Sequence, residues 1–313
     1  MMPRAIHDRP SAPARPRPPA RRRGRRALAA PALAAPVALA LTLSPAPAQE
    51  MAPDGALNTY GLPGIIDMPA AASRAEDELA FTLSHFRNQT RNTLTFQLLP
   101  RLSASFRYAR IDNLGGSGAL FDRSFSLHYR LLDEGTTRPA LALGLNDFLG
   151  TGVYASEYVV LSKTLTPRLR VTGGIGWGRL ATRGGVTNPL GVLDEALETR
   201  PARDTGQGGE VESDTWFRGD AALFGGLEFQ ATERLRLAAE YSSDAYPRED
   251  GAAFDVESPL NVGLKYDLRP GVTLGLNYLY GAELGAQVTF ATNPGERRFG
   301  SGLASAPPPV VPR

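Results

Sequence analysis

His128 and Ser126 are the first candidates for catalysis in this sequence, because a histidine beside a serine can activate it as a nucleophile. They stand two positions apart in a segment that alternates polar and apolar residues, so in a strand both would face the same, polar side. His85 lies near the end of another such segment, on its apolar side. A serine and a histidine that hydrolyse membrane lipid would have to lie together on the apolar face. We therefore expect no catalytic residue, and an enzyme acting on lipid or polysaccharide is an alternative that depends on His128 alone.

Other kinds of site chemistry have less support. The sequence contains no cysteine, which excludes a catalytic thiol, thiolate metal ligands and disulfides. The two histidines named above lie on separate segments without a neighbouring acidic cluster, so we expect no metal site. Gly173, Gly174 and Gly176 lie inside a strand pattern with no helix after it, which indicates close packing or a strand bend and not a phosphate loop. The acidic stretch 194–214 is expected to be a solvated loop, and no cofactor is expected.

The start of the sequence has the composition of an export leader. An Arg- and Pro-rich beginning is followed by an apolar run over 27–43 and by small residues ending at Ala48. This order predicts a secretory signal peptide over 1–48 that is cleaved after Ala48. A transmembrane helix is the alternative, but Pro31 and Pro36 interrupt the apolar run, which is also short for a bilayer.

The charge balance argues against a nucleic-acid partner. The formal net charge is +2, and the leader contributes many arginines but only one acidic residue, Asp8. The exported part is therefore mildly acidic. Such a surface offers no general attraction for a polyanion, so nucleic acid is not expected to bind.

The sequence from Glu78 onward consists of short alternating segments. Leu94, Phe96 and Leu98 alternate with polar residues, for example, which is the period of a strand with one apolar face. Most of these segments are long enough to cross a bilayer as tilted strands. The twelve predicted strands lie near 78–86, 91–99, 102–111, 120–131, 138–148, 153–164, 168–178, 219–230, 233–244, 258–267, 271–281 and 283–291.

Tight turns and longer links alternate between these strands. A strand is expected to follow directly after each of four tight turns, at Pro100, Pro167, Pro270 and 232–235. Longer links occupy 112–119, 179–218 and 245–257. Short turns on one rim and long loops on the other are typical of outer-membrane barrels, whose periplasmic side is trimmed. The sequence thus predicts an all-β fold, a transmembrane antiparallel up-and-down barrel with both ends in the periplasm. The expected organisation is a signal peptide over 1–48, a periplasmic lead-in over 49–77, the barrel over 78–291 and a Pro-rich tail over 292–313.

The two faces of the strands favour a membrane barrel over a soluble sandwich or lipocalin-like barrel, in which the apolar face would point inward. One face carries aliphatic residues at mid-strand and aromatic residues toward one end, as in the run Leu274, Leu276, Tyr278 and Tyr280. The other face is polar and is expected to form the lumen, because its charges would be too costly in lipid. The residues expected to line the lumen are Arg107, His128, Arg130, Arg170, Arg236, Lys265, Glu228 and Glu240.

Several longer stretches resemble a known family in the same order along the chain. They are Asn58–Ala70, Glu78–Thr82, Arg107–Asp112, Phe121–Phe125, Asp147–Gly152, Ser156–Tyr158 and Arg170–Leu180. Together they are similar to the YjbH-type exopolysaccharide proteins, also called the capsule-biosynthesis GfcD group, over roughly residues 57–291. Many members of that family are longer, and many are lipoproteins, whereas this sequence has no cysteine to carry a lipid.

The resemblance implies a non-enzymatic protein of the cell outer membrane that takes part in exopolysaccharide or capsule biosynthesis or export. The partners it implies are outer-membrane lipid, the exopolysaccharide and periplasmic export proteins. A general porin-like pore, which shares the fold, is the alternative. Residues 60–68 combine glycines and a proline with Leu62, Ile65 and Ile66, so they are expected to fold against the lumen mouth or the lower rim, with a disordered tether as the alternative.

Overall fold

The computed structural model describes residues 55–114, 118–202 and 209–295. The predicted signal peptide over 1–48 lies outside these residues, as do the first residues of the predicted lead-in and most of the predicted tail. No helix in the described ranges has the length and apolar character needed to cross a membrane.

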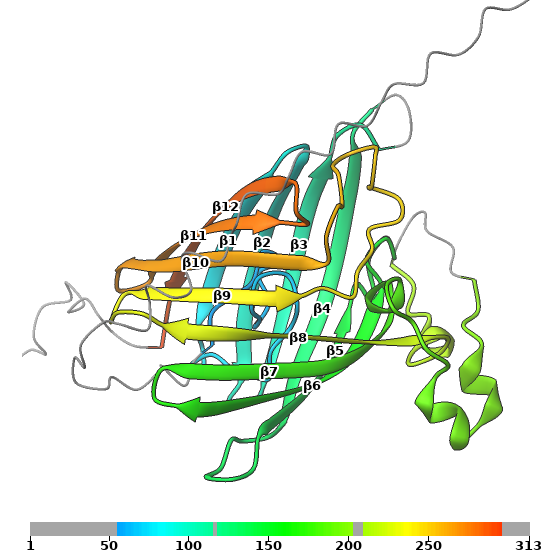
Figure 1. Cartoon of the computed structure of the whole chain (residues 1–313), viewed down its shortest axis with the longest axis horizontal. Coiled ribbons are helices and arrows are strands. Elements are labelled where there is room, and N and C mark those ends of the chain that lie inside the picture. Colours follow the sequence, from blue (N-terminus) through cyan, green and yellow to red (C-terminus); the bar gives the residue numbers. More distant parts are fainter. Residues whose placement is uncertain (1–54, 115–117, 203–208, 296–313) are drawn as a thin grey trace, which may run out of the picture. The chain divides into compact units, whose positions relative to one another are not determined.

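Twelve antiparallel strands form one closed barrel (Figure 1). Each strand pairs with its neighbours in sequence, and β1 pairs with β12 to close the sheet. The strands are β1 (Leu79–Phe86), β2 (Gln89–Leu99), β3 (Leu102–Ile111), β4 (Leu120–Leu132), β5 (Ala140–Asn146), β6 (Ser156–Thr166), β7 (Leu169–Gly178), β8 (Ala221–Gln230), β9 (Leu235–Tyr241), β10 (Leu260–Arg269), β11 (Val272–Leu279) and β12 (Glu283–Thr292).

The predicted fold class, an all-β up-and-down barrel of the outer-membrane type, is confirmed. Each predicted range overlaps one strand, with small differences at the ends. The strand predicted from residue 153 begins only at Ser156, because Val153 and Tyr154 leave the sheet and pack in a buried core with Ile65.

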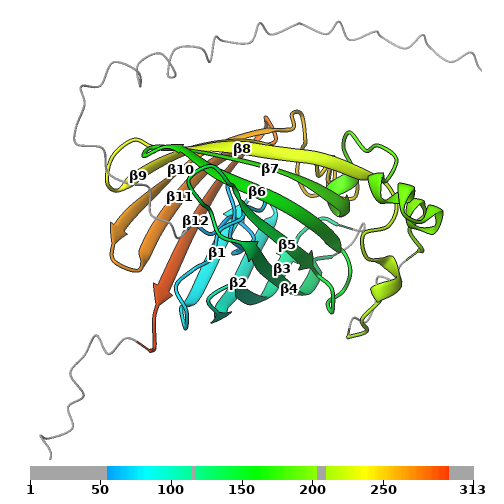
Figure 2. The ribbon, with the colours of Figure 1, turned by 90° about the horizontal axis from the view of Figure 1, so that it is seen from below.

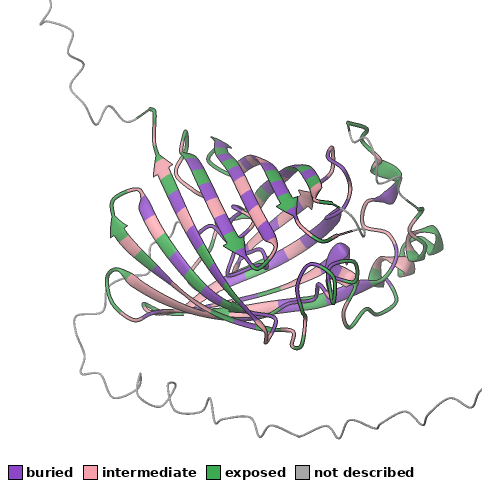
Figure 3. Cartoon of the chain, turned by 90° about the horizontal axis from the view of Figure 1, so that it is seen from above, coloured by how far each residue is buried: buried purple, intermediate pink, exposed green. Residues whose placement is uncertain are grey.

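Buried and exposed residues alternate along the strands (Figure 3), and the exposed ones are largely apolar whereas many of the buried ones are polar. Along β3, for example, Ser105 and Arg107 are buried, whereas Tyr108 is 40% exposed. The expectation that Tyr280 belongs to the outer face is wrong. Strand β11 ends at Leu279, and Tyr280 has a φ of +57°, so its side chain is buried instead of following Leu274 and Leu276 outward.

The two rims of the barrel differ in their connections, as predicted. The short-turn rim carries the links β2–β3, β6–β7, β8–β9 and β10–β11, together with the somewhat longer β4–β5 link. The barrel begins and ends there too, where the Asn293 side chain donates a 2.8 Å hydrogen bond to the Glu76 carbonyl. The long-loop rim carries 112–119, 147–155, 179–220 and 242–259, together with the short β1–β2 and β11–β12 links. Its 3₁₀ turns are η2 (Arg179–Ala181), η3 (Pro189–Val192), η4 (Glu195–Glu198) and η5 (Ser213–Thr215).

Residues 55–74, here called the inner segment, lie inside the barrel, where Figure 2 shows them as a blue coil within the ring of strands. Ile65 and Ile66 are completely buried and share one apolar core with Tyr154, Tyr246 and Phe254 of the long-loop rim. The inner segment is therefore a packed part of the barrel interior, held from within by burial of its apolar side chains.

Close packing accounts for a glycine that the sequence placed inside a strand. A Cβ on Gly174 of β7 would lie 2.3 Å from the ring of Phe224, a buried side chain of β8. The absence of a side chain at Gly174 lets the Phe224 ring lie over the sheet, which agrees with the expectation of close packing in this stretch.

Candidate functional site

The inner segment is folded on itself before it meets the barrel. Isolated bridges join Leu57 to Pro63 and Gly64 to Pro69, and the backbone N–H of Thr59 donates to the carbonyl of Ile66 at 2.7 Å. These contacts make two small reversals of the chain, which a sequence rich in glycine and proline favours. The fold turns backbone N–H and C=O groups outward, toward the polar wall.

Glu240 on β9 binds one edge of the inner segment. Its carboxylate accepts hydrogen bonds from the backbone N–H groups of Ile66 at 2.8 Å, Asp67 at 2.8 Å and Met68 at 3.1 Å. The Asn261 side chain donates a further bond at 2.8 Å. All of these groups are buried. A buried carboxylate without hydrogen-bond donors would destabilise the fold, and these four donors prevent that.

Lys265 on β10 binds backbone carbonyl groups of the inner segment. Its ammonium donates to the carbonyls of Ile65 at 2.6 Å and Leu57 at 2.8 Å. Gln287 on β12 donates to the same Leu57 carbonyl at 3.0 Å. An acidic and a basic side chain of neighbouring strands thus hold the N–H and the C=O groups of the inner segment, respectively.

Asp67 is the centre of a buried polar network. Its carboxylate accepts hydrogen bonds from the hydroxyls of Thr59, Tyr246 and Tyr280, and lies 3.6 Å from the Arg91 guanidinium. Burial raises the pKa of Tyr246 and Tyr280 well above its ordinary value, so both hydroxyls stay protonated and act as donors. The network joins the inner segment to β2, to the 242–259 link and to the end of β11.

Arg179 joins the long-loop links beside the Asp67 network, since its guanidinium lies 5.0 Å from the ring centre of Tyr246. Its guanidinium donates to Asp244 at 2.8 Å and to Glu249 at 2.6 Å, and lies 4.8 Å from the ring centre of Tyr154. Burial raises the pKa of Asp244, an effect that the nearby Arg179 charge opposes. These contacts connect Tyr154 of the 147–155 link with the 242–259 link, and Tyr154 and Tyr246 both pack in one core with Ile65 of the inner segment.

His128 has a structural environment. Its Nε2 lies 2.8 Å from the carbonyl oxygen of Ala72, which can only accept, so Nε2 is the donor. Its Nδ1 lies 2.9 Å from the Tyr158 hydroxyl. Both ring nitrogens are therefore occupied, and neither is directed at Ser126, whose hydroxyl accepts from the backbone N–H of Asp147 at 3.3 Å.

The residues expected to line the lumen all have side chains on the interior side of the sheet. Arg107, His128, Lys265, Glu228 and Glu240 are almost completely buried, and Arg170 is buried as well. Arg130 and Arg236 are half-buried toward the short-turn rim, where each lines a cavity. The interior that they face is occupied by the inner segment, so most of them contact protein atoms.

Sequence reasoning did not single out Arg91, Asp67 or Arg179. Arg91 alternates with Thr93 and Thr95, so its polar-face position could have been recognised. Asp67 stands between Ile66 and Met68 in a segment without periodicity, and nothing in the sequence indicates its partners.

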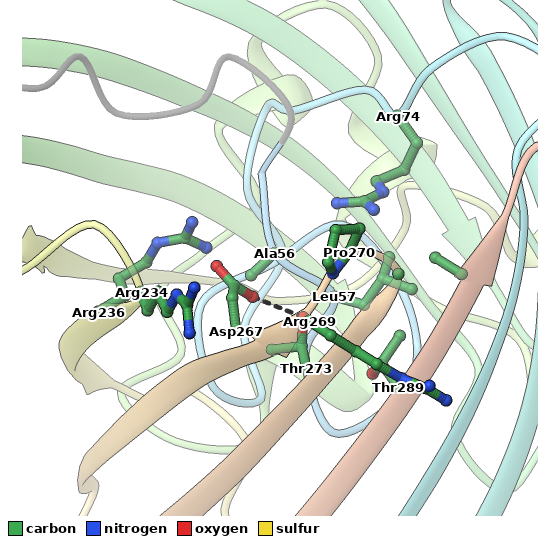
Figure 4. A pocket seen from close by; sticks show the side chains of 12 residues that line it. Ala56, Leu57, Arg74, Arg234, Arg236, Asp267, Arg269, Pro270, Thr273 and Thr289 are labelled. Carbon is green, nitrogen blue, oxygen red and sulfur yellow. Dashed lines mark hydrogen bonds between the residues drawn. The ribbon is translucent and has the colours of Figure 1, made fainter.

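A cavity of about 460 Å³ remains at the short-turn mouth of the lumen (Figure 4). Its residues come from strands β9 to β12, the adjoining turns and the inner segment. They are Ala56, Leu57, Arg74, Arg234, Arg236, Asp267, Arg269, Pro270, Gly271, Thr273, Thr289 and Ala291. No group of three or more His, Asp or Glu side chains able to hold a metal ion occurs within 55–114, 118–202 and 209–295.

Comparison with known proteins gives a family match over most of the chain. The family model described as "Exopolysaccharide biosynthesis protein YbjH" matches residues 56–313. The uncharacterized lipoprotein YjbH of Escherichia coli (strain K12) is 31% identical over 245 residues, which are 75% of this chain and 34% of that protein. The chain thus spans about a third of the length of the curated relative that it matches.

Solved structures are similar in fold alone. The KdgM porin has 9% identity and a TM-score of 0.39, with 68% of this chain and 98% of that chain covered. The outer membrane protein Omp33 of Acinetobacter baumannii has 11% identity and a TM-score of 0.36, with 69% of this chain and 97% of that chain covered.

Proposed function

We propose, from the premise that this chain belongs to the YjbH family of exopolysaccharide biosynthesis proteins, that it is a non-enzymatic outer-membrane barrel of the exopolysaccharide machinery whose lumen is closed by its own inner segment. The family resemblance stated from the sequence is confirmed by the match over residues 56–313. In this proposal the polymer and the periplasmic export proteins are partners of a sealed barrel, and outer-membrane lipid surrounds it.

One observation carries the proposal: the wall of the barrel binds the backbone of the inner segment on several sides. Glu240 accepts from its N–H groups, Lys265 donates to its carbonyls, and Ser162 of β6 accepts from the N–H of Ala71 at 2.9 Å. Side chains that line an open channel would be hydrated instead. A hydrated polysaccharide cannot pass while these bonds persist, so we infer that the barrel acts beside the polymer's path or opens only after the inner segment has moved.

The general pore is the weaker alternative for the same reason. Packed groups occupy the lumen from its long-loop end, where Asp67 contacts Tyr246, to the Lys265 contact with the Ile65 carbonyl on the wall. The enzyme alternative loses its only support, because both ring nitrogens of His128 already bind protein atoms.

Deletion of residues 57–69 from the full chain tests the proposal. The purified full-length chain should show no steady conductance in planar bilayers, whereas the deletion variant should still insert and conduct ions. Secretion of exopolysaccharide by cells carrying the deletion should change as well. A matched control is deletion of the exposed Thr136 and Thr137 in the β4–β5 link of the same rim, which should leave the barrel closed. A deletion variant that inserts, stays closed and supports normal secretion contradicts the proposal.

A further inference from the structure

The cavity at the short-turn mouth has the size of a small-molecule site. Its volume of about 460 Å³ lies within the range of about 300–1,000 Å³ that is usual for ligand pockets. Its floor is formed by Ala56 and Leu57, whose position is held by the bonds from Lys265 and Gln287 to the Leu57 carbonyl. The backbone of the inner segment therefore helps to define the shape of the cavity.

Arginine outnumbers carboxylate in this cavity. Arg74 already forms a 2.7 Å ion pair with Glu78, but within the described part of the chain no carboxylate lies within ion-pair distance of Arg234 or Arg236. The one side-chain bond of Arg236 runs from Nε to Gln230 at 3.2 Å. Figure 4 shows the guanidinium groups of Arg234 and Arg236 on the same side of the Asp267 carboxylate. Their remaining N–H groups can form the paired bonds that guanidinium makes with a planar carboxylate.

Asp267 restricts the kind of anionic ligand that fits the cavity. Its Oδ1 accepts a 2.7 Å hydrogen bond from the Thr273 hydroxyl, which leaves Oδ2 available as an acceptor. A carboxylate at this position repels a phosphate, which brings negative charge but few donors. It attracts hydroxyl groups, which donate. A ligand that offers both a carboxylate for the arginines and hydroxyls for Asp267 satisfies the whole set, and a sugar acid is such a ligand.

We propose that this cavity binds an acidic saccharide unit, with its carboxylate on Arg234 and Arg236 and a ring hydroxyl on Asp267. Pro270 and Leu57 supply apolar surface against the sugar ring. The proposal rests on the proposed function, because the polymer of an exopolysaccharide pathway is the expected source of such a unit. It places the docking point at the mouth of the lumen, outside the part that the inner segment fills.

Isothermal titration calorimetry of the full chain in detergent micelles tests the site with tri-galacturonate and with its methyl ester. The ester keeps the rings and all of their hydroxyls but removes the charge of the carboxylates, so it should bind at least about tenfold more weakly. The R234Q/R236Q double variant should lose about tenfold or more in affinity for tri-galacturonate. The matched control is R138Q, which removes an exposed arginine of the same rim outside the cavity and should bind as the unsubstituted chain does.

Asp267→Asn separates a saccharide from a phosphate source such as a lipid headgroup. The substitution should lower the affinity for tri-galacturonate severalfold and raise the affinity for inorganic phosphate. Equal binding of acid and ester, unchanged binding in folded R234Q/R236Q, or tighter binding of inorganic phosphate than of tri-galacturonate by the unsubstituted chain would overturn the site. A barrel that is closed in bilayers but binds no tri-galacturonate overturns this inference alone, whereas an open unsubstituted barrel overturns the proposed function whatever it binds.

Discussion

The carboxylate of Glu240, on strand β9, accepts a 2.8 Å hydrogen bond from the backbone N–H of Ile66 inside the barrel. The two residues are 174 positions apart in the sequence. An acidic residue of the wall thus binds the backbone of the segment that fills the lumen, and both residues are buried.

Glu240→Ala should therefore loosen the inner segment more than it disturbs the sheet. The substitution leaves the N–H groups of Ile66, Asp67 and Met68 buried without their acceptor, so we expect a loss of about 3 kcal/mol in the free energy of unfolding. Urea unfolding of the refolded barrel measures the loss, and planar bilayers should detect intermittent ion conductance. Glu233→Ala, at an exposed position of the β8–β9 turn, is the control and should change neither. Equal stability of the two variants would mean that the Glu240 bonds do not hold the segment.

Asp67→Asn tests the network on the other side of the inner segment. The amide keeps the shape of the side chain but removes the charge that faces Arg91 and receives the hydroxyls of Tyr246 and Tyr280. We expect a loss of about 1–3 kcal/mol in the free energy of unfolding, as for a buried polar group deprived of its partner. Asp250→Asn on the exposed part of the 242–259 link is the comparison. Hydrogen exchange of the inner segment should accelerate in the first variant only.

Leu276→Arg tests whether the outer face meets lipid. Leu276 lies in the middle of β11 and is 58% exposed on the apolar outer wall. An arginine near the bilayer midplane of such a barrel costs about 2–4 kcal/mol, so assembly in the membrane should fall sharply. Val192 is even more exposed, but it belongs to η3 in the 179–220 link, and Val192→Arg should assemble normally. Equal amounts of both variants in the membrane fraction would argue that the outer wall does not face lipid.

Protease treatment of intact cells tests the orientation of the barrel. The 179–220 link is long and carries exposed residues, whereas Pro100, Pro167 and Pro270 lie in tight turns at the opposite rim. If the long loops face outward, cleavage should occur within 179–220 and spare those turns. Mass spectrometry of the fragments identifies the sites, and cutting confined to the turns would show the reverse orientation.

The barrel itself could be predicted because its determinants are local. A period of two residues in a strand places alternate side chains on opposite faces, so the segment around Leu94, Phe96 and Leu98 already specifies an outer face without knowledge of its neighbours. The lengths of the links then separate two rims. The interior positions of Arg107, Lys265 and Glu240 follow from the same alternation.

The contents of the lumen were decided only by the tertiary structure. The inner segment has no period, and its bonds to Glu240, Lys265 and Arg91 join backbone and side-chain groups that lie far apart in the sequence. Tyr280 is a second example. Alternation along β11 predicts that its side chain points outward, but the positive φ of Tyr280 turns it inward, where its hydroxyl donates to Asp67. Alternation can say that a charged side chain points inward, but whether it meets water or a buried peptide group depends on what the closed sheet encloses, and that is a property of the whole chain.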